Sequence, residues 1–398
     1  MTPKARPLEG LRILDFSRVL AGPFCSVLLA DVGAEVIKIE PPGGDDYRHI
    51  GPFKKGESAL FMLVNRGKQS VVVDLKSVGG ADLVHELAAV SDVVVENYRP
   101  GVAARLGIDY GSLSTTNPQL VYASVSGFGQ TGPMAERPSY DIVAQALSGM
   151  MSITGDAEGP PMRTGEPMGD LCAGLFAAWG IMVALYARDR NGHGSHVDVA
   201  MFDTLLSLLP TSLAQLLYAG DEPVRTGNRH PLSSPFGSFE AGDGHVIIAV
   251  ANNALFERLS NALAMPELVE DPRFVSDEER TRHEPLLRAL IEDWARQRSV
   301  AEVVAILDKH AVPASPICSV EQAVASAQTA FRRLLCDTDH PLAGGIRMPE
   351  QPVHFSGVER GELEPSPLLG EHTDAILSRL LGADRTRIAS LRRENIIA

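Results

Sequence analysis

An aspartate placed directly before a long apolar segment is the residue of this chain best suited to covalent chemistry. Asp170 follows Gly169 and precedes the uncharged, Ala- and Gly-rich run 171–187. A core helix over this run would put Asp170 at its N-cap or in its first turn, where free N–H groups and the helix dipole favour a carboxylate. The Asp170 side chain then has one of two roles. It only caps the helix, or it stays ionised at the N-terminal end of the helix and is available as a nucleophile.

Polar and cationic groups follow several of the expected strands. Asn97, Tyr98 and Arg99 come directly after the apolar run 92–96. An amide, an aromatic ring and a guanidinium at a strand end suit a stacked base and a phosphate, although a solvated Pro-Gly turn accounts for the same residues. Further cations near strand ends are Lys38, Arg48, Arg66, Lys68 and Lys76. Such a cluster in an acidic protein favours a phosphate-bearing ligand, even though single Lys and Arg residues are usually at the surface.

Other catalytic signatures are absent or out of context. The segment 127–132 matches G-x-G-x-x-G, but Pro133 follows at once and no apolar helix begins there, so we interpret it as a turn. The sequence contains no nucleophile elbow, HExxH or Walker loop. The four cysteines are scattered, which favours a reduced compartment over a disulfide framework and makes a metal site unexpected.

Composition limits the class of protein further. The chain has 398 residues, 44% of them hydrophobic, and a net charge of −14, as expected for a soluble protein of two domains. The acidic balance argues against nucleic acid or an anionic membrane as a partner. The apolar run 171–187 is short for a bilayer span and the N-terminus lacks a signal core. We therefore expect a cytoplasmic protein.

Short β-rich runs alternate with helix-length segments over the first 125 residues. Strands are expected at 11–16, 34–39, 70–75, 92–96 and 120–125. This alternation predicts an α/β fold with a Rossmann-like, mostly parallel sheet and helices on both faces. Ligands on such sheets bind beyond the carboxyl ends of the strands, which places the site among the loops that follow them.

The rest of the chain predicts a second domain. A turn-rich stretch at 226–237 leads into a β-hairpin arm at 242–250, and polar helices follow. We expect a large α/β domain over residues 1–224, completed by 331–398, and a smaller α+β domain over 225–330.

Taken together, these segments resemble the class III CoA-transferases, the CaiB/BaiF or formyl-CoA transferase-like family. The resemblance covers nearly the whole chain and rests on pieces in the same order: LRILDFSRVLAGP, AEVIKIEPPGGDDYR, NRGKQSVVVDLK, VVENYRPGVAARLGIDY, SVSGFGQTGP, SYDIVAQALSG, the Gly-Asp before the apolar run, GNRHPLSSPFGSF and PLLGEHTDAIL. It implies an interlocked homodimer that takes acyl-CoA and a free carboxylic acid as substrates, with coenzyme A as the carried group and no permanently bound cofactor or metal.

The resemblance also implies roles for individual residues. Asp170 matches the family's nucleophile, which forms an acyl anhydride and then a CoA thioester. Contacts to CoA carry over to Val19, Ala21, Lys76, Asn97, Tyr98 and Arg105. The substrate-pocket positions are Tyr140, Asp141, Arg48, Gly227, Asn228 and Arg229. The stretch 227–231 lacks the glycine run of the family's mobile loop, so a lid does not follow from the resemblance.

Arginines indicate the class of acid. Arg48, Arg66, Arg137 and Arg229 are candidates for bidentate pairing with the far carboxylate of a dicarboxylic acid. We therefore expect CoA to pass from succinyl-CoA to an acid of the itaconate, mesaconate, citramalate or glutarate type. The missing glycine run makes formate and oxalate less favoured. Transfer within one dicarboxylic acid, and carnitine or aromatic acceptors, stay open.

An α-methylacyl-CoA racemase has the same fold and is the main alternative. Racemases of this kind use a His-Asp pair where this chain has Tyr140 and Asp141. Without the histidine, exchange of the α-proton between two bases lacks one base. A CoA-binding scaffold without turnover would need an inert site, which the Gly-Asp and Asn-Tyr-Arg segments disfavour.

Overall fold

The structure is a computed structural model that describes residues 6–358 and 361–398. Its contacts divide the chain into two compact units. The larger unit comprises Met1–Met150, Thr164–Ala214 and Ala330–Ala398, and the smaller comprises Met151–Arg163 and Gln215–Thr329. Sequence analysis assigned 151–163 to the larger domain, whereas in the structure the Arg225 guanidinium donates to carbonyls of this segment, among them that of Gly159 at 2.8 Å. These bonds attach the segment to the smaller unit.

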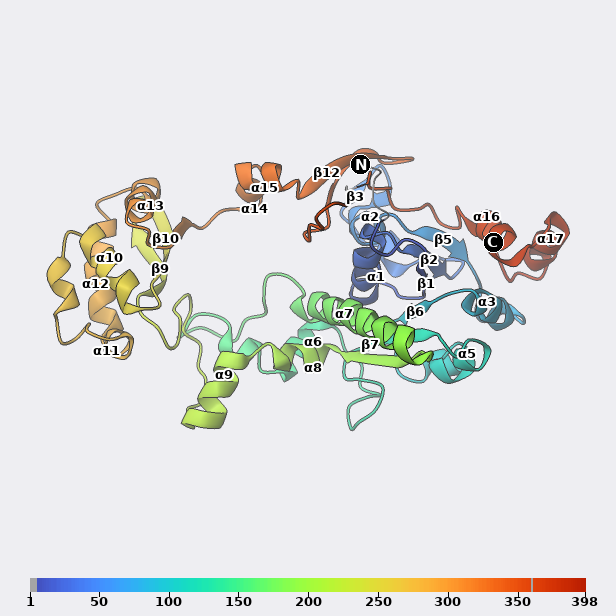
Figure 1. The fold of residues 1–398 in the computed structure, drawn as a ribbon, viewed down its shortest axis with the longest axis horizontal. Helices are drawn as coiled ribbons and strands as arrows, with labels where there is room; N and C mark the ends of the chain where they lie inside the picture. Colours follow the sequence, from blue (N-terminus) through green and yellow to red (C-terminus); the bar gives the residue numbers. More distant parts are fainter. Residues whose placement is uncertain (1–5, 359–360) are drawn as a thin grey trace. The chain divides into compact units, whose positions relative to one another are not determined.

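A six-stranded parallel sheet forms the centre of the larger unit (Figure 1). Its order is β5 (Gln69–Val72), β2 (Glu35–Glu40), β1 (Arg12–Asp15), β6 (Val93–Glu96), β7 (Val121–Ser126) and β8 (His196–Ala200). The five strands expected from apolar runs are present. Sequence analysis missed β8, because the first half of this edge strand is largely exposed, so it has no continuous apolar run.

Helices cover both faces of this sheet, as the alternation of strands and helices predicted. Ile13 and Val93 pack on the side of α1 (Ala21–Asp31) and α7 (Met168–Asn191). Leu14 and Val94, the next residues along the same strands, pack on the opposite side. That side carries α3 (Gly80–Ala89), α5 (Tyr110–Thr116), α16 (Thr373–Leu381) and α17 (Arg385–Arg393). The period-two alternation of strand side chains thus builds two cores, and the C-terminal helices complete one of them.

Helix α7 combines a buried face with an exposed apolar one. By length and composition it is the one helix among the described residues that could cross a membrane, yet half of its most apolar window is buried inside the unit. It packs tightly on α1, since a Cβ at Gly174 would lie 2.7 Å from the Ala21 carbonyl oxygen. These contacts make it a core helix. Its outer apolar side chains form a stripe at helical spacing: Leu175, Trp179, Met182, Val183 and Tyr186.

The smaller unit has its own sheet and core. Strands β11 (Ala314–Pro316), β10 (Gly244–Ala249) and β9 (Phe236–Ala241) form an antiparallel sheet. Around it lie α10 (Asn253–Ala262), α12 (Glu284–Ala295) and α13 (Val300–Lys309). The predicted combination of a parallel α/β domain with a smaller α+β domain is therefore confirmed.

Shorter elements connect these parts. They are β3 (Phe53–Lys54), β4 (Glu57–Ser58), α2 (Ala59–Asn65), α4 (Val102–Arg105), α6 (Asp141–Leu147), α8 (Met201–Ser207), α9 (Pro210–Ala214), α11 (Asp277–Arg282), α14 (Val320–Val324), α15 (Ala327–Arg332), β12 (Leu335–His340) and β13 (Gly344–Pro349). A 3₁₀ turn, Asp46–His49, follows β2 and lies close to the site described next.

Candidate active site

A cavity of about 190 Å³ lies in the larger unit among the loops that follow β1, β6 and β7. This is the edge of a parallel sheet at which ligands bind. Eight residues singled out from the sequence line it: Asp170, Val19, Ala21, Asn97, Tyr98, Arg99, Arg137 and Tyr140. The fold therefore brings together residues that are up to 151 positions apart in the chain, from Val19 to Asp170.

Packing between two helices places Asp170 at this cavity. Helix α7 begins at Met168, so Asp170 is in its first turn. Gly174 is one turn further along the same helix face and contacts the start of α1, where only a glycine fits. Asp170 is consequently held beside the N-terminal end of α1, and both line the cavity.

The residue that caps the start of α7 is Asp141 rather than Asp170. The Gly169 N–H donates to Asp141 Oδ1 at 2.7 Å, and Gln145 Nε2 donates to Asp141 Oδ2 at 2.8 Å. The N-cap residue of α7 is Pro167, which offers no side-chain acceptor. Asp141 therefore satisfies a free N–H of the first turn, and the Asp170 carboxylate is left to the cavity.

The surroundings of Asp170 oppose its ionisation. Burial, together with the negative charge of Asp141, raises the pKa of Asp170 to about 7. The Tyr47 hydroxyl is close enough to respond: burial and then the Asp170 charge raise the pKa of Tyr47 to about 12. The helix start was expected to keep the carboxylate ionised. Burial outweighs this effect, and Asp141, which already accepts from the Gly169 N–H, adds a like charge, so the carboxyl is only partly ionised near neutral pH.

Other predicted site residues lie outside this cavity. Arg48 forms a two-pronged ion pair with Glu40, at 2.8 and 2.7 Å, and stacks 3.7 Å from the centre of the Phe61 ring. Arg66 is paired in the same way with Asp31. Both guanidinium groups therefore already have a carboxylate partner. Lys76 and Arg105 are exposed, the first after β5 and the second at the end of α4.

The three loop residues predicted for the substrate pocket belong to the smaller unit. Gly227 and Asn228 precede Arg229, whose guanidinium pairs with Glu284 at 3.0 Å. Arg229 also lines a cavity of about 150 Å³ within that unit.

Sequence reasoning missed several residues of the main cavity. Arg18 and Asp46 line it and form an ion pair at 3.2 Å. Ser139 lines it as well. Arg99, which the sequence suggested for a phosphate, and Arg137, which it proposed for a second carboxylate, are also among the lining residues. Arg18 closely follows the residues expected to end the first strand, so its position in the chain was the available signal.

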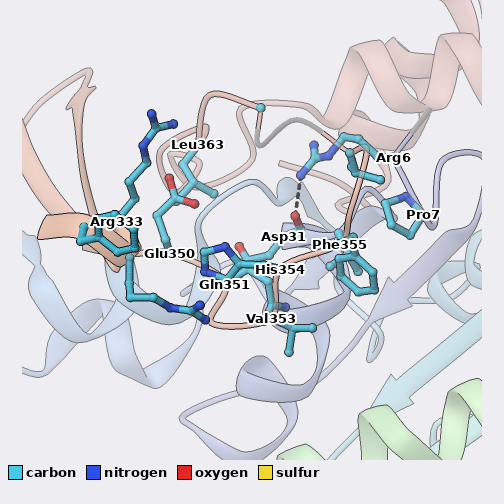
Figure 2. A pocket seen from close by; sticks show the side chains of 15 residues that line it. Arg6, Pro7, Asp31, Arg333, Glu350, Gln351, Val353, His354, Phe355 and Leu363 are labelled. Atoms are coloured by element: carbon cyan, nitrogen blue, oxygen red, sulfur yellow. Dashed lines mark hydrogen bonds between the residues drawn. The ribbon is translucent and has the colours of Figure 1, made fainter. Parts of the chain in front are cut away.

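A second, larger cavity of about 580 Å³ in the same unit holds none of the predicted site residues (Figure 2). Its walls come from Arg6 and the C-terminal end of α1 on one side and from the segment after β13 on the other. In Figure 2 a hydrogen bond joins the Arg6 guanidinium to the Asp31 carbonyl, 2.7 Å away.

The family is defined by comparison with known proteins. CoA-transferase family III matches residues 8–373. The chain is 43% identical over 373 residues to acetyl-CoA:oxalate CoA-transferase of Acetobacter aceti, covering 93% of this chain and 95% of that protein. It is 39% identical over 388 residues to succinyl-CoA:glutarate CoA-transferase of Mus musculus, covering 97% and 89%. The protein belongs to CoA-transferase family III, which confirms the resemblance seen in the sequence.

Solved structures agree with this assignment. A CaiB/BaiF family protein from Brucella suis superposes with a TM-score of 0.83 at 37% identity, covering 95% of this chain and all of that one. An aspartate-to-alanine variant of Rv3272 from Mycobacterium tuberculosis superposes with a TM-score of 0.86 at 31% identity, with the same coverage.

Proposed function

We propose that this protein transfers CoA from succinyl-CoA to a short dicarboxylic acid, with Asp170 as the covalent nucleophile. The observation that carries this proposal is the Asp170 carboxylate at the cavity wall, freed from helix capping by Asp141. Relatives named for succinyl-CoA with glutarate, D-citramalate or mesaconate, at 35–39% identity, support this class of donor and acceptor. The acetyl-CoA:oxalate relative keeps oxalate among the acceptors despite the missing glycine run.

The chemistry consists of four displacements at acyl carbons. An Asp170 oxygen attacks the thioester carbonyl of the donor, and CoA leaves as a thiolate, giving a mixed anhydride. The thiolate attacks the aspartyl carbonyl and expels the donor acid, which leaves an aspartyl-CoA thioester. The acceptor carboxylate attacks this thioester and again displaces the thiolate. Attack of the thiolate on the acceptor acyl carbon then forms the new acyl-CoA and regenerates the Asp170 carboxylate.

Groups around the cavity suit the charges of this reaction. Each displacement passes through an oxyanion, and we assign its stabilisation to N–H groups at the start of α1, which has no side-chain cap. Arg18, Arg99 and Arg137 line the same cavity and supply cations for the CoA phosphates or for the second carboxylate of a dicarboxylic acid. We assign CoA contacts to Val19, Ala21 and Tyr98 on the same grounds, with Lys76 and Arg105 as exposed cations near the carboxyl ends of β5 and β6.

We also propose a cytoplasmic homodimer in which a second copy covers the exposed stripe of α7. Trp179 in this stripe is 65% exposed and Tyr186 is 64% exposed, values that are unusual for large rings on a core helix. Replacing Trp179 by Glu should weaken the dimer at least tenfold, because large aromatic residues dominate interface energies. Analytical ultracentrifugation measures this dissociation, with Val78→Glu, at a 96% exposed position outside the stripe, as the control. An unchanged dimer would move the interface elsewhere.

Mass spectrometry tests the function directly. Succinyl-CoA is incubated with a panel of free acids, and new acyl-CoA is sought with the wild type and with Asp170→Ala. Transfer by the wild type alone supports the proposal. Transfer by Asp170→Ala contradicts the mechanism. Incubation of one labelled dicarboxylic monothioester without an acceptor distinguishes intramolecular transfer, and deuterium exchange at the α-carbon of a 2-methylacyl-CoA without transfer would favour the racemase.

A further inference from the structure

The loop that follows β1 has an unusual backbone conformation at the edge of the main cavity. Val19 has a φ of +66°, a left-handed value that is sterically unfavourable for a β-branched residue. Such a conformation persists only where the surrounding structure imposes it, and it is concentrated at functional sites. The next residues, Leu20 and Ala21, begin α1 and line the cavity together with Asp170.

Side chains from three neighbouring strand ends hold this loop by its backbone. The Ser17 N–H donates to Asp15 Oδ1 at 2.9 Å, and the Ser17 carbonyl accepts from Lys38 Nζ at 2.7 Å. The Asn97 amide binds both backbone groups of Arg18, at 2.9 and 2.7 Å. Asn97 therefore has a structural task in addition to any contact with CoA.

A buried ion pair makes the remaining attachment. The Val19 N–H donates to Asp45 Oδ1 at 3.0 Å, and Asp45 Oδ2 lies 2.8 Å from Lys38 Nζ. Both side chains are 1% exposed. The same pair thus fixes the Ser17 carbonyl through its cation and the Val19 N–H through its anion. Asp45 Oδ1 also accepts from the Tyr47 N–H at 2.9 Å, which ties the loop to the segment whose hydroxyl responds to Asp170.

We infer that the Lys38–Asp45 ion pair is a positioning element of the active site, which forces Val19 into its left-handed conformation and so holds the start of α1 at the thioester position opposite Asp170. This inference rests on the proposed CoA transfer. Neither residue lines the cavity, so the pair acts through the loop rather than by touching the substrate. Displacement of reacting groups by about 1 Å can cost about 100-fold in rate, which is the scale of effect expected here.

Asp45→Asn and a matched control test this inference. Asp31 and Arg66 form another buried pair in the same unit, with 2% and 5% exposed side chains, that does not touch the loop. Asp31→Asn therefore reproduces the loss of a buried pair without the loss of the loop attachment. We expect kcat of folded Asp45→Asn to fall about 100-fold, with weaker CoA binding by calorimetry, while Asp31→Asn retains both values.

Val19→Gly tests whether the Lys38–Asp45 pair acts on the rate through the conformation of Val19. If the pair only stabilised the fold, this substitution would not restore kcat. Glycine adopts positive φ without steric cost, so Val19→Gly should restore kcat of Asp45→Asn by about tenfold and should not raise kcat of the wild type. If Asp45→Asn does not fold, Lys38→Met with Asp45→Leu removes both charges together and is the variant to measure. Kinetics and CoA affinity equal to those of Asp31→Asn, or no recovery with Val19→Gly, would overturn the inference. A wild type without transfer would refute the proposed function instead, and CoA affinity would still test the loop.

Discussion

The two ends of helix α1 border two cavities of the larger unit and are built in opposite ways. At the N-terminal end, the first residues have no side-chain cap and follow a strained loop held by buried charges. At the C-terminal end, about 16 Å away for 11 residues, the Arg6 guanidinium donates to the carbonyls of Ala30 and Asp31. The Asp31 carboxylate there is already paired with Arg66.

This difference distinguishes the cavity that we propose as the active site from the larger one better than their volumes do. The larger cavity is at the C-terminal end, where the polar groups of the helix are satisfied by the protein itself. The smaller cavity is at the N-terminal end, where α1 has no side-chain cap and Asp170 lines the wall. Unsatisfied groups held in place by a rigid scaffold are what covalent catalysis requires.

Removal of the nucleophile should produce the largest effect at the N-terminal end. Asp170→Asn keeps the shape of the side chain but cannot form the anhydride, so kcat should fall by about 10⁴-fold or more. CoA affinity, measured by calorimetry, should stay within a few fold of the wild type. Substantial residual transfer by Asp170→Asn would mean that another residue is the nucleophile. The difference between the two ends of α1 would then not identify the active site.

The same variant should also change stability with pH. The pKa of Asp170 in the folded protein, about 7, lies above its ordinary value of 3.8, so folding favours the protonated carboxyl. Its stabilising contribution is complete below pH 3.8 and is lost as the pH rises through 7. Asp170→Asn should therefore raise the thermal midpoint more at pH 8 than at pH 4, roughly one unit above and three below that pKa. Equal shifts at both pH values would contradict the raised pKa.

The pH dependence of transfer is the next effect in size. Only the ionised carboxylate attacks, so kcat/KM should fall about tenfold per pH unit below about 7. Steady-state kinetics across this pH range measure the fall.

Asp141→Asn removes the like charge beside Asp170 and should lower the pH below which kcat/KM falls. It should also cost stability, because a side-chain amide at this position cannot accept from both Gly169 and Gln145. Gln145→Ala is the control, since it perturbs Asp141 without removing its charge. If the pH dependence of kcat/KM is the same in Asp141→Asn as in the wild type, burial alone sets the pKa of Asp170.

Local patterns predicted the fold and placed Asp170 at the start of a core helix, and long-range packing determined the rest. Continuous apolar runs identified five of the six strands, all but the edge strand β8, and the Gly-Asp before an apolar run singled out Asp170. No local signal showed that Arg48 would be bound by Glu40, because that pair forms only when the segment after β2 folds back on its strand. The capping role of Asp141 was equally hidden, since it joins residues 28 positions apart.

The smallest kinetic effect is expected at the C-terminal end of α1. Arg6→Ala removes two hydrogen bonds to the last carbonyls of the helix and should lower the free energy of unfolding by about 1–2 kcal/mol. It should leave kcat and KM unchanged, because the Asp170 cavity is at the other end of α1. Chemical denaturation and steady-state kinetics on the same preparation measure both quantities. A change in kcat would show that a shift at the C-terminal end of α1 also moves the loop at Val19. The two ends of the helix would then not be independent.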